Sequence, residues 1–168
     1  LRLLSLTDQL TGVYNRRAFE DFFAKERDRA KRYGIPLSVI IFDIDHFKKI
    51  NDTFGHDSGD QVLQGIVQKV KAEMRRIDLL FRWGGEEFLL VLPETDIEST
   101  RYVAERLRTR IEKAKFLIPA KVTVSLGVSQ FCGNDTAETL IKRADLALYQ
   151  AKNSGRNCVA VAPSSDQE

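Results

Sequence analysis

Two strand-like runs lie on either side of the pair Gly84-Gly85, and this arrangement constrains the fold more than any other feature of the chain. The runs cover residues 79–83 and 88–92 and are rich in aliphatic and aromatic side chains. Two such runs joined by a short glycine turn are typical of a β-hairpin, whose strands are antiparallel. A sheet that contains a hairpin is not purely parallel, so a doubly wound parallel fold is disfavoured.

The remainder of the chain alternates between helical and strand patterns and contains no long linker. Helical spacing of apolar residues covers residues 16–33, 59–74, 97–113 and 137–152, and strand patterns cover residues 37–42, 122–128 and 157–161. The last two helices carry predicted capping boxes, formed by Thr95 with Glu98 and by Asp135 with Glu138. We therefore expect one domain in which helices pack on a sheet.

Charge and cysteine content exclude several classes of protein. The 26 Lys and Arg residues nearly balance the 24 Asp and Glu residues, which disfavours a broad surface for a nucleic-acid polymer. Hydrophobic residues make up 43% of the chain, too many for a globally disordered protein. Two cysteines, Cys132 and Cys158, are too few for a disulfide scaffold and are typical of a reduced, cytoplasmic domain. No apolar segment approaches the roughly 20 residues that cross a bilayer, although a longer parent protein could be membrane-anchored.

Acidic residues stand at the ends of two apolar strands. Residues 37–42 run directly into Asp43 and Asp45, and Glu86 and Glu87 precede the next apolar run. A carboxylate at the end of a buried strand needs a partner, and the two aspartates share a face because side chains alternate along a strand. If the acidic pairs converge at one edge of the sheet, they favour Mg²⁺ or Mn²⁺, since no thiolate accompanies them and neither histidine of the chain has a partner at ligand spacing. Mg²⁺ held by few carboxylates suggests nucleotide chemistry.

A structural interpretation of the same carboxylates is also open. Asp43 and Asp45 could cap a helix that starts near Phe47. Glu86 and Glu87 could simply make the hairpin soluble. Each acidic pair taken alone fits this interpretation, whereas the occurrence of both pairs at the ends of apolar strands favours a metal site.

Basic residues near these strands suit phosphate groups. Phe47 and Lys48 lie at an apparent helix start, where free backbone N–H groups favour anions. Lys152 and Arg156 lie around the end of the last helix, although cations are common there for dipole reasons alone. The segment 51–60 is rich in groups that can read a base edge, and a turn with helix caps is the alternative.

Several motifs of the chain resemble one known family. Gly84-Gly85-Glu86-Glu87-Phe88 resembles the signature of the GGDEF-domain family, the bacterial diguanylate cyclases. Further matching segments follow in the family's order, at residues 8–17, 42–52, 55–60, 125–128, 144–152 and 155–157. The resemblance covers roughly residues 8–159, nearly the whole chain, so chance agreement of short motifs is a poor explanation.

The resemblance implies an α+β fold, with a central five-stranded, mainly antiparallel sheet wrapped by helices as in nucleotidyl-cyclase and palm domains. It implies a metal-dependent reaction in which two GTP molecules give cyclic di-GMP and two pyrophosphates, with two Mg²⁺ or Mn²⁺ ions in each half-site. Each domain would hold one GTP, so a homodimer would be needed for catalysis. We expect the catalytic domain to cover residues 8–161. Residues 1–7 would be the end of a linker helix that comes from an upstream regulatory domain, and residues 162–168 would form a disordered tail.

The resemblance also assigns roles to individual residues. Asp43, the Ile44 carbonyl and Glu86 would hold the metals. Glu86 would also act as a base, and Glu87 would support the metals or the attacking hydroxyl, so both glutamates are expected to be catalytic. The substrate-binding residues would be Asn51 and Asp60 for guanine, and Phe47, Lys48, Lys152 and Arg156 for the phosphates.

An RxxD string, Arg75 to Asp78, precedes the signature at the spacing of the family's inhibitory site. The resemblance implies that Arg75 and Asp78 bind the product, with Arg106 as a second contact, since arginine suits bidentate contacts to phosphate and guanine.

Three alternative functions are open: a non-catalytic module that binds cyclic di-GMP or GTP, an enzyme that makes a mixed purine dinucleotide, and a structural dimerisation domain. The first predicts a broken signature, whereas the signature residues are intact here. The second alternative differs from a diguanylate cyclase only in base specificity. Specificity is a difference between the affinities for two substrates, so one side chain such as Asp60 does not decide it. The third leaves the acidic strand ends without a role.

Overall fold

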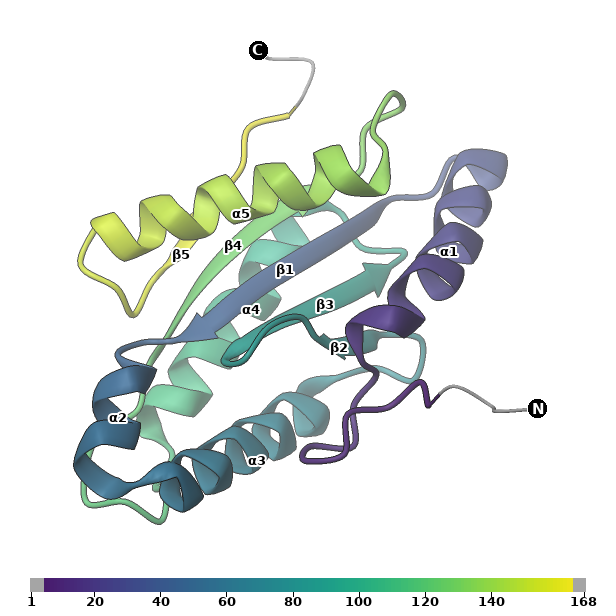
Figure 1. Cartoon of the computed structure of the whole chain (residues 1–168). Coiled ribbons are helices and arrows are strands. Elements are labelled where there is room, and N and C mark those ends of the chain that lie inside the picture. Colours follow the sequence, from purple (N-terminus) through teal and green to yellow (C-terminus); the bar gives the residue numbers. More distant parts are fainter. Residues whose placement is uncertain (1–4, 165–168) are drawn as a thin grey trace.

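The computed structural model describes residues 5–164, which form one five-stranded sheet covered by helices (Figure 1). The strands are β1 (Leu37–Ile44), β2 (Leu79–Arg82), β3 (Glu87–Pro93), β4 (Val124–Gln130) and β5 (Val159–Val161). Their order across the sheet is β2-β3-β1-β4-β5, and every neighbouring pair is antiparallel except β4 and β5. The predicted α+β fold with a mainly antiparallel five-stranded sheet is confirmed.

Both faces of the sheet are covered. The helices of the described residues are α1 (Phe19–Tyr33), α2 (Phe47–Phe54), α3 (His56–Glu73), α4 (Ile97–Lys113) and α5 (Ala137–Asn153), with a short 3₁₀ helix, η1 (Arg16–Ala18), before α1. α1 and α5 cover one face, α3 and α4 cover the other, and α2 lies at the end of β1 (Figure 1). Within residues 5–164, no helix is long and apolar enough to cross a membrane.

Strand β1 is buried on both faces, as its continuous apolar run predicts. Ile40 and Phe42 join a core cluster with α3 and α4, whereas Val39 and Ile41 join a second cluster with α1 and α5. The alternation of side chains along the strand therefore divides the interior into two layers. Because β1 pairs with β3 on one side and β4 on the other, its C-terminal end at Asp43 lies in the middle of the sheet.

The segment 51–60 forms parts of two helices rather than a loop. α2 continues to Phe54, and α3 begins at His56, earlier than the predicted start at residue 59. Gly55 separates the two helices with a φ of 92°, a conformation that glycine adopts without the strain other residues would incur. One residue is thus enough to change the direction of the chain beside the end of β1.

The predicted capping box of α4 is wrong. The cap is Asp96, whose side chain accepts a hydrogen bond from the Ser99 N–H at 2.8 Å. Thr95, the predicted cap, donates instead to the Pro93 carbonyl at 2.8 Å. It also accepts a hydrogen bond from Arg75, so its hydroxyl is not available to the helix.

The predicted capping box of α5 is wrong for a similar reason. Thr136 caps this helix in a reciprocal pair with Thr139. Asp135, the predicted cap, forms a buried ion pair with Arg143. In both helices the cap lies one residue later than predicted, because an arginine engages the expected residue: Arg75, which precedes β2, holds Thr95, and Arg143 of α5 itself holds Asp135.

The two ends of the domain depart in part from the predicted elements. β5 begins at Val159 rather than at residue 157, because the Asn157 N–H donates to Asp45 Oδ2 at 3.0 Å instead of joining the sheet. The predicted linker helix at residues 1–7 and tail at residues 162–168 lie largely outside the described residues. Residues 5–7 form no helix, and Thr7 makes a β-bridge with Tyr14. The domain boundaries stay predictions.

Candidate active site

The two acidic pairs meet at one end of the central strands. Asp43 of β1 stands opposite Glu87 of β3 in the antiparallel register, and the Ile44 N–H donates to the Glu86 carbonyl at 3.2 Å. The β2–β3 hairpin therefore carries both glutamates to the C-terminal end of β1 (Figure 1). The meeting point is an end of the two central strands and not a side edge of the sheet.

Burial and mutual repulsion perturb these carboxylates. Burial raises the pKa of Asp43, nearby carboxylates such as Glu86 raise it further, and the ion pair with Lys152 opposes the rise. Burial also raises the pKa of Glu87, with additional contributions from Asp145 and Asp43. The cluster thus holds more negative charge than the cations of the chain neutralise, which suits a bound cation.

The donor set fits Mg²⁺ or Mn²⁺ together with a phosphate-bearing ligand. Asp43 and Glu86 supply carboxylate oxygens, the ligands that these hard cations prefer. Within the part of the chain that the structure describes, no three His, Cys, Asp or Glu side chains are grouped as a complete metal site. Mg²⁺ commonly uses one or two carboxylates and completes its shell with water and substrate phosphates. The arrangement therefore fits a cation that shares its ligands with a nucleotide.

Asp45 has a structural role. Its carboxylate accepts hydrogen bonds from Ser125 Oγ at 2.6 Å, from Thr123 Oγ1 at 2.7 Å and from the Asn157 N–H at 3.0 Å. These bonds fasten the end of β1 to the start of β4 and to the segment after α5. The N-terminal cap of α2 is His46, which makes no side-chain cap bond, so the alternative that the aspartates cap this helix is wrong.

The predicted phosphate ligands surround the end of β1. They are Phe47 and Lys48 in the first turn of α2, Lys152 in the last turn of α5, and Arg156 just beyond α5. Lys152 forms an ion pair with Asp43, and Arg156 Nη1 lies 3.8 Å from Asp45 Oδ1. Positive charge is thus placed directly beside the carboxylates, where a bound phosphate would need it.

The predicted guanine ligands lie on adjacent helices, Asn51 on α2 and Asp60 on α3. Gly59 packs so closely on Asn51 that a Cβ atom at Gly59 would lie 1.8 Å from Asn51 Oδ1. This oxygen is buried and has no hydrogen-bond partner among residues 5–164. Because an unpaired buried polar atom is costly, Asn51 Oδ1 is suited to accept from a ligand. Sequence reasoning missed Gly59, whose one signal was its place in the matching segment 55–60.

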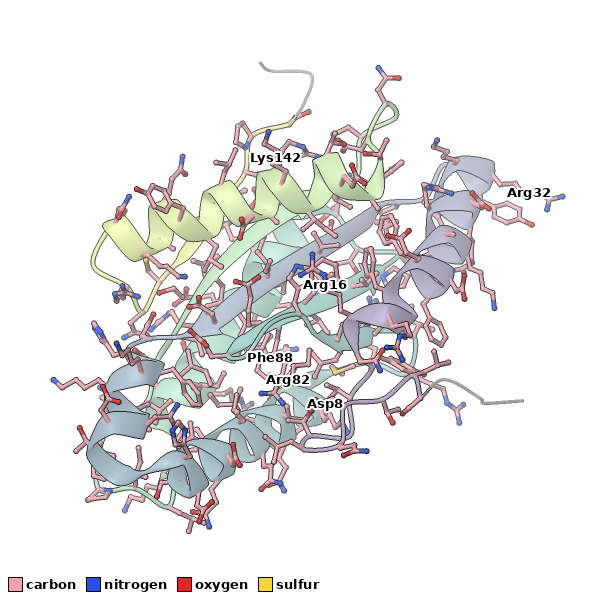
Figure 2. All side chains as sticks on the ribbon, in the orientation of Figure 1. Asp8, Arg16, Arg32, Arg82, Phe88 and Lys142 are labelled. Carbon is pink, nitrogen blue, oxygen red and sulfur yellow. The ribbon has the colours of Figure 1, made fainter. Side chains whose placement is uncertain are left out.

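The turn that carries the glutamates is held from the outside by Asp8 and Arg82 (Figure 2). Arg82 Nη1 lies 3.1 Å from Asp8 Oδ1, and Arg82 Nη2 donates to the Gly85 carbonyl at 2.7 Å. Burial raises the pKa of Asp8, but hydrogen bonds from Thr11 and the charge of Arg82 outweigh burial and leave this pKa below its ordinary value. The N-terminal motif therefore stabilises the hairpin, a role that sequence reasoning did not assign.

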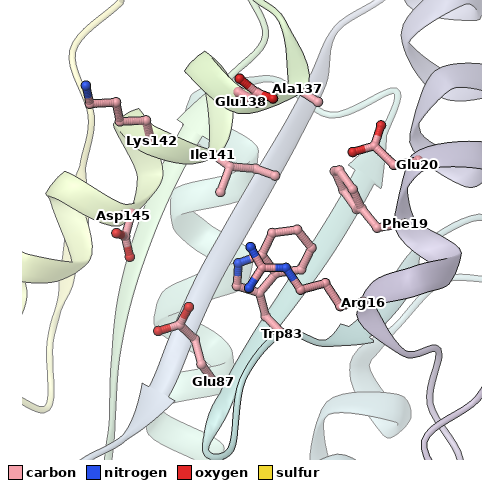
Figure 3. A pocket seen from close by; sticks show the side chains of 10 residues that line it. All are labelled: Arg16, Phe19, Glu20, Trp83, Glu87, Ala137, Glu138, Ile141, Lys142 and Asp145. Atoms are coloured by element: carbon pink, nitrogen blue, oxygen red, sulfur yellow. The ribbon is translucent and has the colours of Figure 1, made fainter.

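A cavity of about 490 Å³ lies beside Glu87, between η1, α1, the hairpin and α5 (Figure 3). The Arg16 guanidinium stacks over Trp83, with its carbon 4.2 Å from the ring centroid. Asp145 borders the cavity from α5. Sequence reasoning assigned none of these three residues a role. The available signal was the position of Asp145 two helical turns before Lys152, on the same side of the helix.

The residues of the predicted product site lie at the other end of β3. Arg75 Nη2 donates to Asp78 Oδ1 at 2.9 Å, to the Pro93 carbonyl at 2.7 Å and to Thr95 Oγ1 at 2.6 Å. These residues border a cavity of about 200 Å³, and Arg106 of α4 also lines it. The structure thus brings the two arginines and Asp78 together, away from the acidic cluster.

Comparisons with known proteins agree with these features. A family model described as the GGDEF domain of diguanylate cyclases matches residues 5–158. The response regulator PleD of Caulobacter vibrioides is 46% identical over 93% of this chain and 36% of its own length. The diguanylate cyclase DgcP of Pseudomonas aeruginosa is 43% identical over 96% of this chain and 24% of its own length. The chain therefore spans about a quarter to a third of the length of these relatives.

Solved structures show the same fold. The GGDEF domain of DgcB from Caulobacter crescentus, solved in complex with c-di-GMP, superposes with a TM-score of 0.91 at 31% identity over 98% of this chain and 97% of that one. The active GGEEF domain of a diguanylate cyclase from Vibrio cholerae gives a TM-score of 0.85 at 36% identity over 96% of this chain and 100% of that one.

Proposed function

We propose, because the chain belongs to the diguanylate cyclase GGDEF-domain family, that it condenses two GTP molecules into cyclic di-GMP and releases two pyrophosphates. The observation that carries this proposal is the meeting of Asp43, Glu86 and Glu87 with Lys152 at one end of the central strands. Such a cluster offers carboxylates to divalent cations and a cation to phosphate. The proposal places the domain in the cytoplasm, the compartment that supplies GTP.

Asp43, the Ile44 carbonyl and Glu86 would hold two Mg²⁺ or Mn²⁺ ions. These cations supply charge that acidifies the attacking hydroxyl and offsets the phosphates. The buried, mutually repelling carboxylates support this assignment, because a cation relieves their repulsion.

The chain's own side chains would perform the remaining steps. The 3′-oxygen of one GTP forms a bond to the α-phosphorus of the other, the bond from that phosphorus to pyrophosphate breaks, and Glu86 accepts the hydroxyl proton. Glu87, the next residue and the first of β3, would hold the hydroxyl for attack. Lys152 would exchange its Asp43 partner for phosphate, and Arg156, Phe47 and Lys48 would complete the phosphate contacts.

Asn51 and Asp60 would select guanine. The Asp60 carboxylate can accept hydrogen bonds from N1–H and the 2-amino group, which adenine does not offer together. Asn51 Oδ1 is buried and has no hydrogen-bond partner among the described residues, so it can accept a hydrogen bond from another donor group of the base. Pairing of the buried Asn51 oxygen adds discrimination, because a base without the matching donor leaves this oxygen unsatisfied.

Gly59→Ala is expected to raise the Michaelis constant for GTP by about tenfold or more, because the added methyl group displaces Asn51 from the base. Steady-state kinetics with varied GTP would measure the change. Gln61→Ala, which alters an exposed side chain two residues further along α3, is the matched control and should leave the constant unchanged. A normal Michaelis constant in Gly59→Ala would exclude Asn51 from base recognition.

Catalysis would need a second copy of the domain. Each copy holds one GTP, and cyclic di-GMP contains two new phosphodiester bonds, so two half-sites would face each other in a two-fold arrangement. An upstream regulatory domain, joined to the N-terminal end of this chain, would set that pairing.

Cyclic di-GMP would also inhibit the enzyme at the second site. Arg75, Asp78 and Arg106 would bind the product there, because guanidinium groups suit phosphate and guanine edges. The arrangement of these three residues around one cavity supports the proposal.

The direct test is to incubate the domain at high concentration with GTP and Mg²⁺ and to identify products by mass spectrometry. We expect cyclic di-GMP and pyrophosphate, no product after chelation of the metal, and little incorporation of adenosine when ATP competes. Binding of GTP without any dinucleotide would instead indicate a non-catalytic module. A mixed dinucleotide would contradict the guanine assignment of Asn51 and Asp60.

A further inference from the structure

The cavity around Arg75 and Asp78 is lined by more acidic than basic side chains. Its charged residues are the carboxylates of Glu73, Asp78 and Glu94 and the guanidinium groups of Arg75 and Arg106. Asp78 is already engaged by Arg75, and Glu94 pairs with Arg29 outside the cavity. Glu73 is therefore the carboxylate whose partners decide how much positive charge the cavity offers to an anion.

Glu73 bridges two helices through two arginines. It is the last residue of α3, and its Oε2 lies 2.8 Å from Arg106 Nε while its Oε1 lies 3.0 Å from Arg110 Nε. The two arginines are one helical turn apart on α4, so a single carboxylate holds both. The Glu73 side chain is only 14% exposed, so water screens these ion pairs less than it screens pairs on the open surface.

Arg106 is held by this carboxylate and by little else. Its side chain is 38% exposed, and its Nε makes no aligned hydrogen bond. Its guanidinium carbon also lies over the Tyr102 ring, 5.8 Å from the ring centroid. Arg106 is thus restrained by charge but keeps donors that a ligand can use, whereas Arg75 already donates to three acceptors.

We propose that Glu73 sets the affinity of this cavity for cyclic di-GMP by competing with the ligand's phosphates for Arg106. The inference rests on the proposed product site and adds a residue that weakens binding there. A phosphate that approaches Arg106 meets the Glu73 charge and has to replace the ion pair before it gains the full contact. Arg110 compensates part of the Glu73 charge, but it lies outside the residues that line the cavity.

Glu73→Gln is expected to tighten binding of cyclic di-GMP by about three- to tenfold, because it removes the competing charge and keeps the side-chain size. Isothermal titration of the purified domain with cyclic di-GMP measures the dissociation constant directly. A merely structural role would loosen binding, so a gain in affinity identifies competition. Glu105→Gln is the matched control: it removes an exposed carboxylate of α4 that pairs with Arg108, and should change the constant by less than about twofold.

Two further titrations separate the inference from the product site on which it rests. In an Arg106→Gln background, Glu73→Gln should lose its effect, because the arginine it competes for is absent. Two outcomes would overturn the role of Glu73 alone, provided that Arg75→Ala abolishes binding. In the first, Glu73→Gln leaves the dissociation constant unchanged. In the second, Glu73→Gln tightens binding to the same extent in the Arg106→Gln background. Failure of both the parent and Glu73→Gln to bind, or equal binding by Arg75→Ala, would overturn the product site and the inference together.

Discussion

Glu86→Gln is expected to reduce formation of cyclic di-GMP by about a thousandfold or more. The change removes a carboxylate that would hold the metals and accept the hydroxyl proton, and metal-assisted stabilisation of charge is worth several kcal/mol in such reactions. The amide keeps the size of the side chain, and Glu86 contributes to the fold through its backbone carbonyl, which the substitution leaves in place. Single-turnover rates of dinucleotide formation from GTP would measure the loss.

The control for this prediction is Glu98→Gln on α4. Glu98 is 72% exposed and pairs with Arg101 on the same helix, so its loss costs little and should leave the rate unchanged. Thermal unfolding of both variants should match that of the parent. A Glu86→Gln domain that retained more than about a tenth of the parent rate would contradict the assignment of the acidic cluster as the catalytic centre.

Gly127→Ala is expected to destabilise the domain by about 3 kcal/mol or more, at or beyond the upper end of ordinary overpacking. Gly127 lies in β4 where α5 crosses it, and a Cβ atom there would lie 2.1 Å from the Ala144 carbonyl oxygen and 2.4 Å from the Leu148 nitrogen. Both atoms belong to the backbone of α5, so no side-chain rotation relieves the clash. Urea denaturation would measure the free energy of unfolding.

Gly133→Ala is the matched substitution for this test. Gly133 has no atom within 4 Å of its would-be Cβ and no positive φ, so the added methyl group should change the free energy of unfolding by less than about 0.5 kcal/mol. Because α5 also carries Lys152, surviving Gly127→Ala protein should have reduced activity as well. Equal stability of the two variants would contradict the close approach of α5 to β4.

Particular residues show which features of the fold could be predicted from the sequence and which could not. The run from Leu37 to Phe42 predicted a strand buried on both faces, and the hairpin around Gly84 predicted antiparallel pairing; both are confirmed. These features depend on the period of side chains along a strand and on local turn chemistry. Prediction failed at the caps of α4 and α5, because Thr95 is engaged by Arg75, 20 residues earlier in the chain, and Asp135 by Arg143 of α5 itself.

In the candidate site, too, some features could be predicted from the sequence and others could not. Its acidic residues were recognisable because carboxylates at the end of a buried strand need partners wherever they occur. The partners themselves were not recognisable: Lys152 pairs with Asp43 across 109 residues, and Ser125 bonds to Asp45 across 80. Sequence spacing carries no information about such contacts, which arise only when β1, β4 and α5 pack together.

The sequence by itself therefore determined which elements form, which faces they bury and which chemical groups stand at their ends. The tertiary structure decided that Asp43 is a candidate ligand while Asp45 is an anchor, although the two lie only two residues apart, Asp43 near the end of β1 and Asp45 just beyond it. It also decided that Gly59 shapes the surroundings of Asn51 and that Glu73 restrains Arg106. The physical reason is that secondary structure follows from interactions between near neighbours, whereas the charge, burial and partners of a side chain follow from packing of distant segments.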